Sequence, residues 1–438
     1  MHSYNTVSWH QPAPGLDTIE AMVTPSRVHS RIYTDERIFQ LEIDRIYSRA
    51  WVYVGHHSEV PRPGDFKTRV IGRTPVIMVR GKDGVVRLLV NRCRHRGAQV
   101  CETESGNAKV FRCWYHGWIY NNDGTLAEVT SPEAYEQPLD PVAMGLSPVP
   151  RVDHYRGFVF GSLAHDGDDL PTYLGSARAM MDLLCDASPS GEILADGGTH
   201  KTVFNANWKL VGMDGYHPNY LHASVVAAWG RNPESGVGST HRESPFVDSA
   251  ATRTRDFGHG HVMLDFRGHR IKHYDALTSF LRKIAGGEQY ITDMHARYGT
   301  ERARLLISLA GDAHLGVFPN MQLIHNQIRI ITPISAGRTE VTMTAVRLAG
   351  VSDALNAERF RQQESFYGPA GAGSPDDAEI FERAQRGLVA EVNPWVEISR
   401  GLGRQQIDES DGSIVGRITD EVTQRGIMRY WKHLMTAA

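Results

Sequence analysis

Short runs of β-branched and aromatic residues, separated by glycine-containing turns, dominate the chain from about residue 50 to residue 165. In residues 74–93 two such runs flank the turn at 82–84, where glycine can supply the positive φ that a tight hairpin requires. Residues 111–129 repeat this pattern around a second turn at 122–124. The pattern therefore predicts an all-β unit built from hairpins in this part of the chain.

Beyond residue 165 the spacing of apolar residues changes to that of helices. It predicts helices in residues 171–187, 274–286 and 288–310. Two long strands are predicted next, at residues 321–334 and 339–348, followed by helices near residue 355, near residue 375 and from residue 419 onward. This order of elements favours one antiparallel sheet with several helices around it.

Together these patterns predict an α+β fold, in which a small all-β domain is inserted into a larger domain made of an antiparallel sheet and helices. We expect residues 1–48 to form the N-terminal part of the larger domain, residues 49–165 the inserted β domain, and residues 166–438 the rest of the larger domain. The sequence contains no internal repeat and no low-complexity segment.

The composition argues against several classes of partner. The chain has 438 residues and a net charge of −3, so it offers no overall electrostatic reason to bind nucleic acid or an anionic membrane. It has no apolar run long enough to span a membrane, and the first fifteen residues lack the features of a signal peptide. Four cysteines are too few for a disulfide scaffold and suit a reducing compartment, so we expect a cytoplasmic protein.

Two cysteines and two histidines lie close together in the predicted β unit. Cys93 and His95 are one residue apart, and after seventeen intervening residues Cys113 and His116 follow, two residues apart. Such a set can hold tetrahedral Zn²⁺, or a Rieske [2Fe–2S] cluster with both Cys on one iron and both His on the other. Each predicted hairpin tip contributes one residue of each type, which favours the cluster over a zinc finger. Cys101, in the intervening loop, is not expected to be a ligand.

Asp214, His217 and His222 form a second candidate group, spaced by two and then four residues. In an ideal helix His217 and His222 would point about 140° apart, so they could share one metal only if the helix were broken, as Pro218 would allow. Asp214 would lie on the same helix face as His217 and could orient its imidazole. Spacing alone leaves open the alternative that these are ordinary histidines near a helix end.

The sequence also contains rival histidines. Residues 258–261 have the sequence GHGH, and His269 and His273 follow. Because no companion motif accompanies them, we expect these histidines to lie in loops or at the surface.

Non-haem Fe(II) that activates O₂ is typically held by two His and one carboxylate, so a third ligand is required. The candidate is Asp377, within residues 368–385. A structural role is also open, because Ser374 has the character of an N-cap, Pro375 that of the first helical residue, and Asp377 that of a carboxylate stabilised by the helix dipole. Residue types alone favour this structural role.

The two groups together resemble the large subunits of Rieske non-haem iron aromatic-ring-hydroxylating oxygenases. The sequences NRCRHRGAQV and FRCWYHGWIYNNDGTL are similar to the cluster-binding segments of that family. Its members also have Asn-Trp-Lys before a D-x2-H-x4-H motif, and later a Gly-Pro-Ala-Gly followed by an Asp-Asp pair that opens a helix. These features occur here at residues 207–209, 214–222, 368–371 and 376–377, and the similarity extends from about residue 30 to the C-terminus.

The resemblance implies a role for each candidate residue and a catalytic domain of the helix-grip type. The implied ligands of the [2Fe–2S] cluster are Cys93, His95, Cys113 and His116. The implied ligands of a mononuclear Fe(II) are His217, His222 and Asp377. Asp214 is implied as the bridge that carries electrons to this iron from His116 of a neighbouring subunit in a trimer.

The implied enzyme is the terminal oxygenase component of an aromatic-ring dioxygenase or hydroxylase. It would receive electrons from NAD(P)H through a reductase, directly or by way of a ferredoxin, and use O₂ to cis-dihydroxylate or hydroxylate an aromatic ring. Large subunits of this pattern usually assemble with a small β subunit into an α3β3 hexamer. We expect an aromatic carboxylate as substrate, from the resemblance of residues 216–222 to enzymes of hydroxy- and carboxyl-bearing rings. A neutral arene is the alternative, because the C-terminal third resembles the phenylpropionate and biphenyl type.

Residues 210–213 depart from the family pattern. Many relatives have three or four more residues between Asn-Trp-Lys and the Asp, so about one helical turn is missing here. Residue patterns alone also leave two other classes open. One is a zinc-stabilised binding module with no redox role, and the other is a pure electron carrier, which would not need the downstream His and Asp residues.

Overall fold

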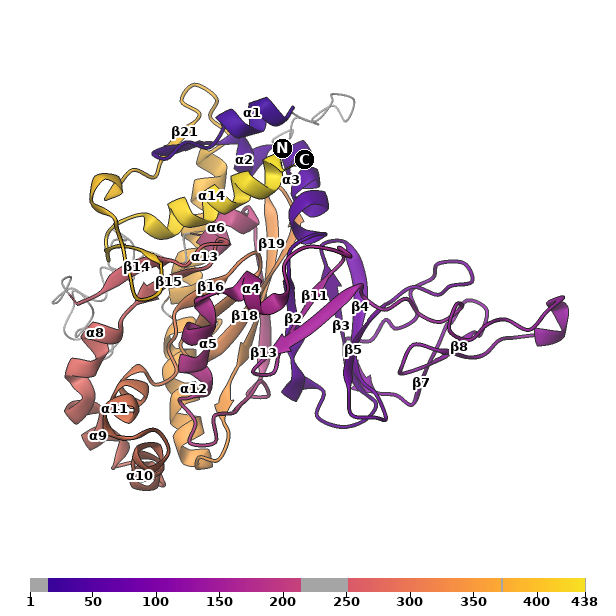
Figure 1. Cartoon of the computed structure of the whole chain (residues 1–438), viewed down its shortest axis with the longest axis horizontal. Helices are drawn as coiled ribbons and strands as arrows, with labels where there is room; N and C mark the ends of the chain where they lie inside the picture. The colour runs from indigo at the N-terminus through magenta and orange to yellow at the C-terminus, as the bar shows by residue number, and fades with distance from the viewer. Residues whose placement is uncertain (1–14, 214–250, 372, 438) are drawn as a thin grey trace.

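The computed structural model describes residues 15–213, 251–371 and 373–437. A large lobe built around a sheet carries an elongated all-β arm at one side (Figure 1). Helix α1 (Leu16–Ala21) packs against α14 (Val422–Thr436), so segments from near the two ends of the chain lie together on the large lobe (Figure 1). This arrangement confirms the predicted α+β class.

The large lobe contains a nine-stranded sheet in which all neighbouring strands are antiparallel. In spatial order its strands are β13 (Thr199–Phe204), β19 (Arg338–Ala345), β18 (Gln327–Ser335), β17 (Met321–Ile324), β16 (Leu315–Val317), β15 (Val262–Asp265), β14 (Arg253–Asp256), β23 (Ile414–Arg417) and β22 (Gln406–Ile407). The sheet therefore brings together side chains that are up to two hundred residues apart in sequence.

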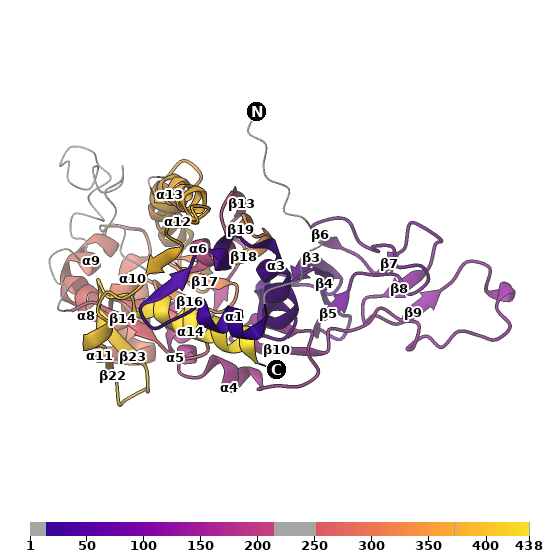
Figure 2. The same cartoon turned by 90° about the horizontal axis from the view of Figure 1, so that it is seen from above.

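Helices cover both faces of this sheet. The other described α-helices are α2 (Arg31–Thr34), α3 (Glu36–Glu42), α4 (Leu170–Leu174), α5 (Ala177–Cys185), α6 (Trp208–Met213), α8 (Arg267–Arg270), α9 (Tyr274–Leu281), α10 (Gly287–Tyr298), α11 (Thr300–Leu309), α12 (Asp353–Tyr367) and α13 (Gly373–Gly387). Figure 2 shows α13 on one side of the sheet and α4 and α5 on the other. None of the described helices is long and apolar enough to cross a membrane.

Alternate strand residues enter two separate hydrophobic cores, as the two-residue period of a strand requires. Val262 and Ile331 face a core shared with α6, α13 and α14. Met263 and Leu323 face the opposite core, shared with α4, α5, α10 and α11. Helices α6 and α13 pack on the face that carries Ile331. These two helices precede or contain the predicted iron ligands.

The arm is built from three smaller sheets, of which the first adjoins the large lobe. These are β10–β11–β2, with β10 (Arg151–Tyr155), β11 (Phe158–Ser162) and β2 (Val52–His56); β5–β4–β3–β6, with β5 (Val86–Val90), β4 (Thr74–Arg80), β3 (Asp65–Ile71) and β6 (Ser105–Asn107); and β7–β8–β9, with β7 (Val110–Arg112), β8 (Ile119–Asn121) and β9 (Leu126–Glu128). Both predicted hairpin turns are confirmed, because Gly84 and Gly124 join paired strands with φ of 80° and 96°.

Four predicted elements are wrong in detail. Residues 171–187 form two helices, α4 and α5, because Gly175 between them has a φ of 50°. Residues 339–348 form β19 and the short β20 (Arg347–Leu348).

Residues 321–334 do not form one strand, because the chain turns back at His325 and pairs Ile324 with Gln327 in the hairpin β17–β18. His325 has a φ of 55°, which permits this tight turn inside a continuous run of strand-forming residues. Residues 288–310 form two helices, α10 and α11, because Gly299 between them has a φ of 74°.

A fully buried ion pair joins three distant helices. The Lys209 ammonium of α6 lies 2.5 Å from a carboxylate oxygen of Glu42 in α3, and neither side chain is exposed. The same carboxylate accepts hydrogen bonds from the indole nitrogens of Trp208, at 2.8 Å, and of Trp431 in α14, at 2.7 Å. A buried ion pair is tolerated only when its remaining hydrogen bonds are satisfied, so the two indoles help to stabilise this pair.

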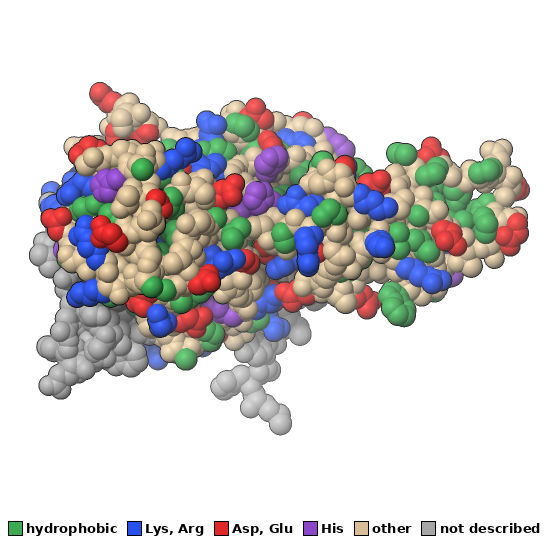
Figure 3. Space-filling view, turned by 90° about the horizontal axis from the view of Figure 1, so that it is seen from below, with side chains coloured by type: hydrophobic (Ala, Val, Ile, Leu, Met, Phe, Trp, Pro, Cys, Tyr) green, Lys and Arg blue, Asp and Glu red, His purple; other side chains and the backbone are tan. Residues whose placement is uncertain are grey.

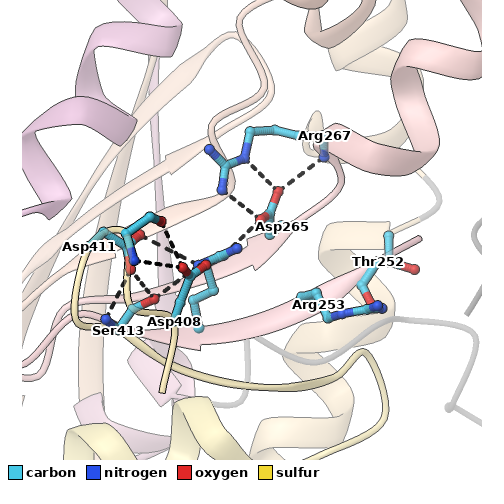
Figure 4. Close-up of polar contacts among 9 residues, drawn as sticks. Thr252, Arg253, Asp265, Arg267, Asp408, Asp411 and Ser413 are labelled. Carbon is cyan, nitrogen blue, oxygen red and sulfur yellow. Dashed lines mark hydrogen bonds and ion pairs between the residues drawn. The ribbon is translucent and has the colours of Figure 1, made fainter. Parts of the chain in front are cut away.

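A second polar network ties the opposite edge of the sheet together. Arg255 of β14 contacts Asp265 of β15 and Asp408 of the β22–β23 loop, each at 2.8 Å, and donates to the Ser413 hydroxyl at 2.9 Å. Asp265 also pairs with Arg267 at 2.7 Å (Figure 4). The carboxylates of this network are paired with arginines from the same edge, so its role is structural.

Candidate metal centres

The four predicted cluster ligands lie in two loops of the arm with the same backbone hydrogen bonds. The Cys93 N–H donates to the Ala98 carbonyl at 2.8 Å, and the Gly97 N–H donates to the Cys93 carbonyl at 2.9 Å. The equivalent bonds of the second loop, from Cys113 and Gly117, are 2.8 and 3.0 Å long. Gly97 and Gly117 have φ of 77° and 74°, a conformation that favours glycine. Each cysteine therefore opens a tight loop that a glycine closes four residues later.

The side chains of these loops meet in two pairs. The Cys93 thiol lies near Cys113, and burial together with this neighbouring thiol raises the pKa of Cys113. The rings of His95 and His116 are 4.6 Å apart between centroids. His95 Nδ1 is buried and has no hydrogen-bond partner among the described residues. The thiols thus pair with each other and the imidazoles pair with each other.

This pairing decides between the two groups that the sequence left open, a single zinc ion and a [2Fe–2S] cluster. A single Zn²⁺ requires its donors to converge on one point. Nowhere in the described ranges do three His, Cys, Asp or Glu side chains converge in this way. A [2Fe–2S] cluster instead requires one Cys pair and one His pair, each for its own iron. The donor set of the arm therefore fits the cluster.

Aromatic side chains surround these pairs. The buried Trp118 ring stacks on His95, with centroids 5.1 Å apart and planes within 5° of parallel. The Tyr120 hydroxyl lies 3.1 Å from Cys93 Sγ, and its oxygen accepts a hydrogen bond from the Arg94 N–H at 3.0 Å. Because its oxygen is already an acceptor, the Tyr120 hydroxyl can donate to the sulfur.

The end of the arm exposes hydrophobic side chains. Trp114 is 90% exposed and Tyr115 60%, and both lie in the loop between Cys113 and His116. Figure 3 shows hydrophobic side chains gathered at this end of the molecule. The ligand pairs are therefore close to an exposed, partly apolar surface of the kind that other proteins bind.

Asp377 is the one predicted iron ligand that the described residues include. It lies near the start of α13, as predicted. The predicted N-cap role of Ser374 is wrong, because α13 already begins at Gly373 and the Ser374 hydroxyl instead donates to the Tyr367 carbonyl at 2.9 Å. The hydroxyl therefore ties α13 back to the end of α12.

The surroundings of Asp377 raise the pKa of its carboxyl group. Burial raises the pKa of this carboxyl to about 7, Arg329 of β18 opposes the rise, and the adjacent Asp376 adds to it. A carboxylate held at such a position is suited to bind a cation. The residue present therefore fits a metal ligand.

Three predicted site residues lie outside the described residues: Asp214, His217 and His222. Helix α6, described as Trp208–Met213, directly precedes them in the chain. The Gln322 side-chain amide of β17 donates to the carbonyls of Val211 and Gly212, at 3.3 Å each. The sheet thus holds the part of α6 that directly precedes the predicted ligand segment.

A buried polar cluster around Asp312 was not predicted from the sequence. The buried Asp312 carboxylate lies 3.3 Å from the Arg270 guanidinium, 3.4 Å from His314 Nδ1 and 3.7 Å from His325 Nε2. We call Asp312, Arg270, His314 and His325 the Asp312 cluster. Its members come from α8, from the loop before β16 and from the β17–β18 turn, so only the D-x-H spacing at 312–314 was a signal in the sequence.

The predicted loop or surface position is wrong for two rival histidines. His261 is 1% exposed, its Nε2 donates to the Tyr173 carbonyl at 2.8 Å, and its Nδ1 accepts from the Phe318 N–H at 3.1 Å. His269 is 5% exposed. A tight turn at 258–260 places His261 in the core, where its two partners fix one neutral tautomer.

Two family models match the chain. The model described as a Rieske [2Fe-2S] domain matches residues 50–145, and the model described as the ring hydroxylating alpha subunit catalytic domain matches residues 192–411. The 2-halobenzoate 1,2-dioxygenase large subunit of Burkholderia cepacia is 33% identical over 385 residues, covering 86% of this chain and 80% of that subunit. The chain belongs to the ring-hydroxylating oxygenase alpha-subunit family.

Two further relatives are similar to this chain over most of its length. The anthranilate 1,2-dioxygenase large subunit of Acinetobacter baylyi is 31% identical, over 92% of this chain and 86% of that subunit. The solved structure of a mutant naphthalene 1,2-dioxygenase bound to phenanthrene is 26% identical, with a TM-score of 0.81 over 94% of this chain and 93% of the other. The fold of the alpha subunit is therefore that of a ring-hydroxylating dioxygenase.

Membership of this family confirms the predicted enzyme class and cofactors. The alpha subunit is an oxidoreductase that uses a Rieske [2Fe–2S] cluster, a mononuclear iron and O₂ to hydroxylate aromatic rings. Members of the family work with reductase components and often with a β subunit. The zinc-stabilised binding module and the pure electron carrier, the two alternative classes, are wrong.

Proposed function

We propose that this alpha subunit is the terminal oxygenase of a system that cis-dihydroxylates an aromatic carboxylate. The observation that carries the proposal is its similarity to 2-halobenzoate and anthranilate dioxygenases, at 33% and 31% identity over most of its length. A neutral arene is the alternative, supported by the structural similarity to naphthalene dioxygenase at 26% identity. Biphenyl and chlorobenzene dioxygenase alpha subunits are each 32% identical over 93% and 94% of this chain, so neutral arenes are tested beside the acids.

The proposed ligands of the [2Fe–2S] cluster are Cys93 and Cys113 on one iron and His95 and His116 on the other. Support comes from the two equivalent loops, the Cys pair, the His pair and the buried His95 Nδ1 without a partner among the described residues. The Trp118 ring covers His95, and the Tyr120 hydroxyl can donate to Cys93 Sγ. These residues orient the ligands and keep water away from them.

The proposed ligands of the mononuclear iron are His217, His222 and Asp377, with Asp214 as the electron bridge between the two centres. Support comes from the packing of α13, the helix of Asp377, against α6 and from the Gln322 bonds to Val211 and Gly212, shortly before Asp214. When bound, the cluster supplies single electrons and the iron activates O₂. Gln322 and α13 would hold the two ligand segments on the same face of the sheet.

The proposed domains, partners and location follow from the same family membership. Domain boundaries at 1–48, 49–165 and 166–438 are supported by the placement of the small sheets between residues 52 and 162. We propose a reductase, acting directly or through a ferredoxin, and a small β subunit in an α3β3 hexamer, with no nucleic acid or membrane partner. Four free cysteines among the described residues are in keeping with the cytoplasm.

Variants at the two centres test the ligand assignment separately. Cys113→Ser is expected to remove the visible absorption and the labile sulfide of the cluster. Asp377→Asn is expected to keep both and to lose the mononuclear iron and all product. Cys101→Ser is the matched control, because Cys101 is also buried in the arm but is not a proposed ligand. Loss of the cluster in the control, and its survival in Cys113→Ser, would refute the assignment.

A single-turnover assay tests the substrate class. The chemically reduced protein is mixed in air with benzoates, salicylates and neutral arenes, and the products are identified by mass. A gain of two oxygens and two hydrogens on a carboxylated ring is expected. If only neutral arenes gain oxygen, the aromatic acid is the wrong substrate class.

A further inference from the structure

Helix α13 carries the proposed iron ligand Asp377 on a face that is packed against the lobe. Asp377, Phe381 and Gln385 are spaced four residues apart, so they lie within about 80° of one another around the helix axis. The ring of Phe381 is buried, and its centroid lies 6.1 Å from that of Phe204, the last residue of β13. The packing of this face therefore sets the rotation of α13 and with it the direction of Asp377.

Gln385 joins this face of α13 to the start of α6. Its side-chain oxygen accepts a hydrogen bond from the Asn207 N–H at 2.9 Å. Its side-chain amide donates to the Tyr33 carbonyl at 3.2 Å. Asn207 directly precedes α6, and Tyr33 belongs to α2. One neutral side chain therefore links the helix of Asp377 to α2 and to the helix that leads into the proposed histidine ligands.

Asn207 is itself held firmly at this junction. It is 1% exposed, and its side-chain amide donates to the carbonyls of Tyr33 at 3.1 Å and Ala336 at 2.7 Å. Its side-chain oxygen accepts from the Lys209 N–H at 3.0 Å. Asn207 cannot shift without breaking these bonds, so it is a fixed point to which Gln385 attaches α13.

A second polar link between α13 and the same segment lies nearer the surface. One Glu382 carboxylate oxygen accepts from the backbone N–H and the side-chain amide of Asn205, each at 3.0 Å and in an exposed setting. Water can replace these bonds. The Asn207 N–H belongs to a buried residue, so the loss of its partner is costly. Gln385 is therefore the link whose removal should move α13.

We propose that Gln385 is a positioning residue for the mononuclear iron. Its bonds to α2 and to the start of α6 hold α13 at the rotation at which Asp377 can share a metal with His217 and His222. This inference rests on the proposed function, because it takes these three residues as the ligands. Groups that orient a metal ligand contribute to the affinity for the metal, and Gln385 would do so through the helix it fixes.

Three substitutions test this role. Gln385→Met keeps the length of the side chain and removes both hydrogen bonds, whereas Gln385→Glu keeps the acceptor for the Asn207 N–H and removes the donor. Gln362→Met is the matched control in the adjacent helix α12, because the Gln362 amide bonds to Glu358 of its own helix at 3.2 Å. The [2Fe–2S] protein is freed of mononuclear iron with a chelator, and its Fe(II) affinity is measured by equilibrium dialysis. Cluster absorption and urea unfolding are followed on the same samples.

Gln385→Met is expected to weaken Fe(II) binding about tenfold, the lower end of the range for groups that orient a metal ligand. Gln385→Glu should cause a smaller loss, because it retains the bond from Asn207, and it decides the test if Gln385→Met fails to fold. Gln362→Met should bind Fe(II) as the wild type does. Cluster absorption should be the same in all variants, because the proposed cluster lies in the arm.

Three results would overturn the inference: wild-type Fe(II) affinity in both Gln385 variants, an equal loss in Gln362→Met, or loss of the cluster together with the iron in both Gln385 variants. Fe(II) binding by Asp377→Asn is measured in parallel. If Asp377→Asn loses iron and both Gln385 variants keep it, only the positioning role is wrong. If Asp377→Asn binds Fe(II) normally, the ligand assignment is wrong, and the positioning role that acts through it is wrong as well.

Discussion

The end of the arm and the centre of the large lobe place their functional side chains in different ways. In the arm, all four candidate cluster ligands come from residues 93–116, and each loop is closed by hydrogen bonds within six residues. In the lobe, Glu42, Lys209 and Trp431 meet at one carboxylate. The first arrangement depends on local backbone geometry, and the second exists only when the whole lobe is folded.

The arm and the lobe also differ in how they are stabilised. The arm keeps its aromatic residues Trp114 and Tyr115 exposed beside the ligand pairs. The lobe buries charges whose partners are far away in sequence, so removal of one partner leaves an uncompensated group in the interior. Substitutions that break the buried Glu42–Lys209 pair should therefore lower the stability of the whole protein. Substitutions in the arm should instead change the properties of the cluster.

The largest expected effect is that of Glu42→Gln. The substitution leaves the Lys209 ammonium buried without its counter-charge, which costs about 3–5 kcal/mol of the free energy of unfolding. Urea unfolding measures this loss, and the cluster absorption of the folded variant should be unchanged. Asp408→Asn in the Arg255 network is the control, with a much smaller loss, because Asp408 is a partly exposed partner whose charge is screened by solvent. Equal losses in the two variants would contradict the special role of the buried pair.

The next largest expected effect is a loss of folding stability at low pH, caused by protonation of His261 in the unfolded chain. Burial lowers the pKa of His261 from 6.5 to about 3, so between these values the unfolded chain binds a proton that the folded chain does not. The stability present above pH 6.5 is therefore lost as the pH falls, by about 2 kcal/mol from pH 7 to pH 5 for this one group.

Urea unfolding of the wild type and of His261→Gln at both pH values tests this assignment. The variant should lose about 2 kcal/mol less than the wild type between pH 7 and pH 5. An identical pH dependence in the two proteins would mean that another group is responsible.

The smallest effect is expected in the arm. Tyr120→Phe removes a hydrogen bond to Cys93 Sγ worth about 1 kcal/mol, which should lower the reduction potential of the cluster by about 40 mV. Redox titration of the visible spectrum measures the shift. Tyr135→Phe is the control, because Tyr135 packs near Trp118 but has no described contact with a ligand sulfur. A shift of the same size in the control would indicate loss of packing rather than of the hydrogen bond.

The candidate cluster ligands could be predicted because the signal is local. A pair of Cys and His residues beside each of two hairpin turns is visible in the printed sequence, and the turns at Gly84 and Gly124 form as predicted. The candidate iron ligand Asp377 was less clear, since residue types alone favoured an ordinary helix start. The family resemblance, rather than helix chemistry, identified it.

The sequence by itself determined the α+β class, the arm of hairpins, the candidate Cys and His ligands and the family resemblance, because these signals lie in short segments of the chain. Only the tertiary structure decided that residues 321–334 turn back at His325, that His261 is buried, and that Asp312 meets three basic side chains. These features arise where separate elements of the folded lobe pack together. The spacing of residues along the chain does not indicate such contacts. They form only when the sheet and its helices pack together.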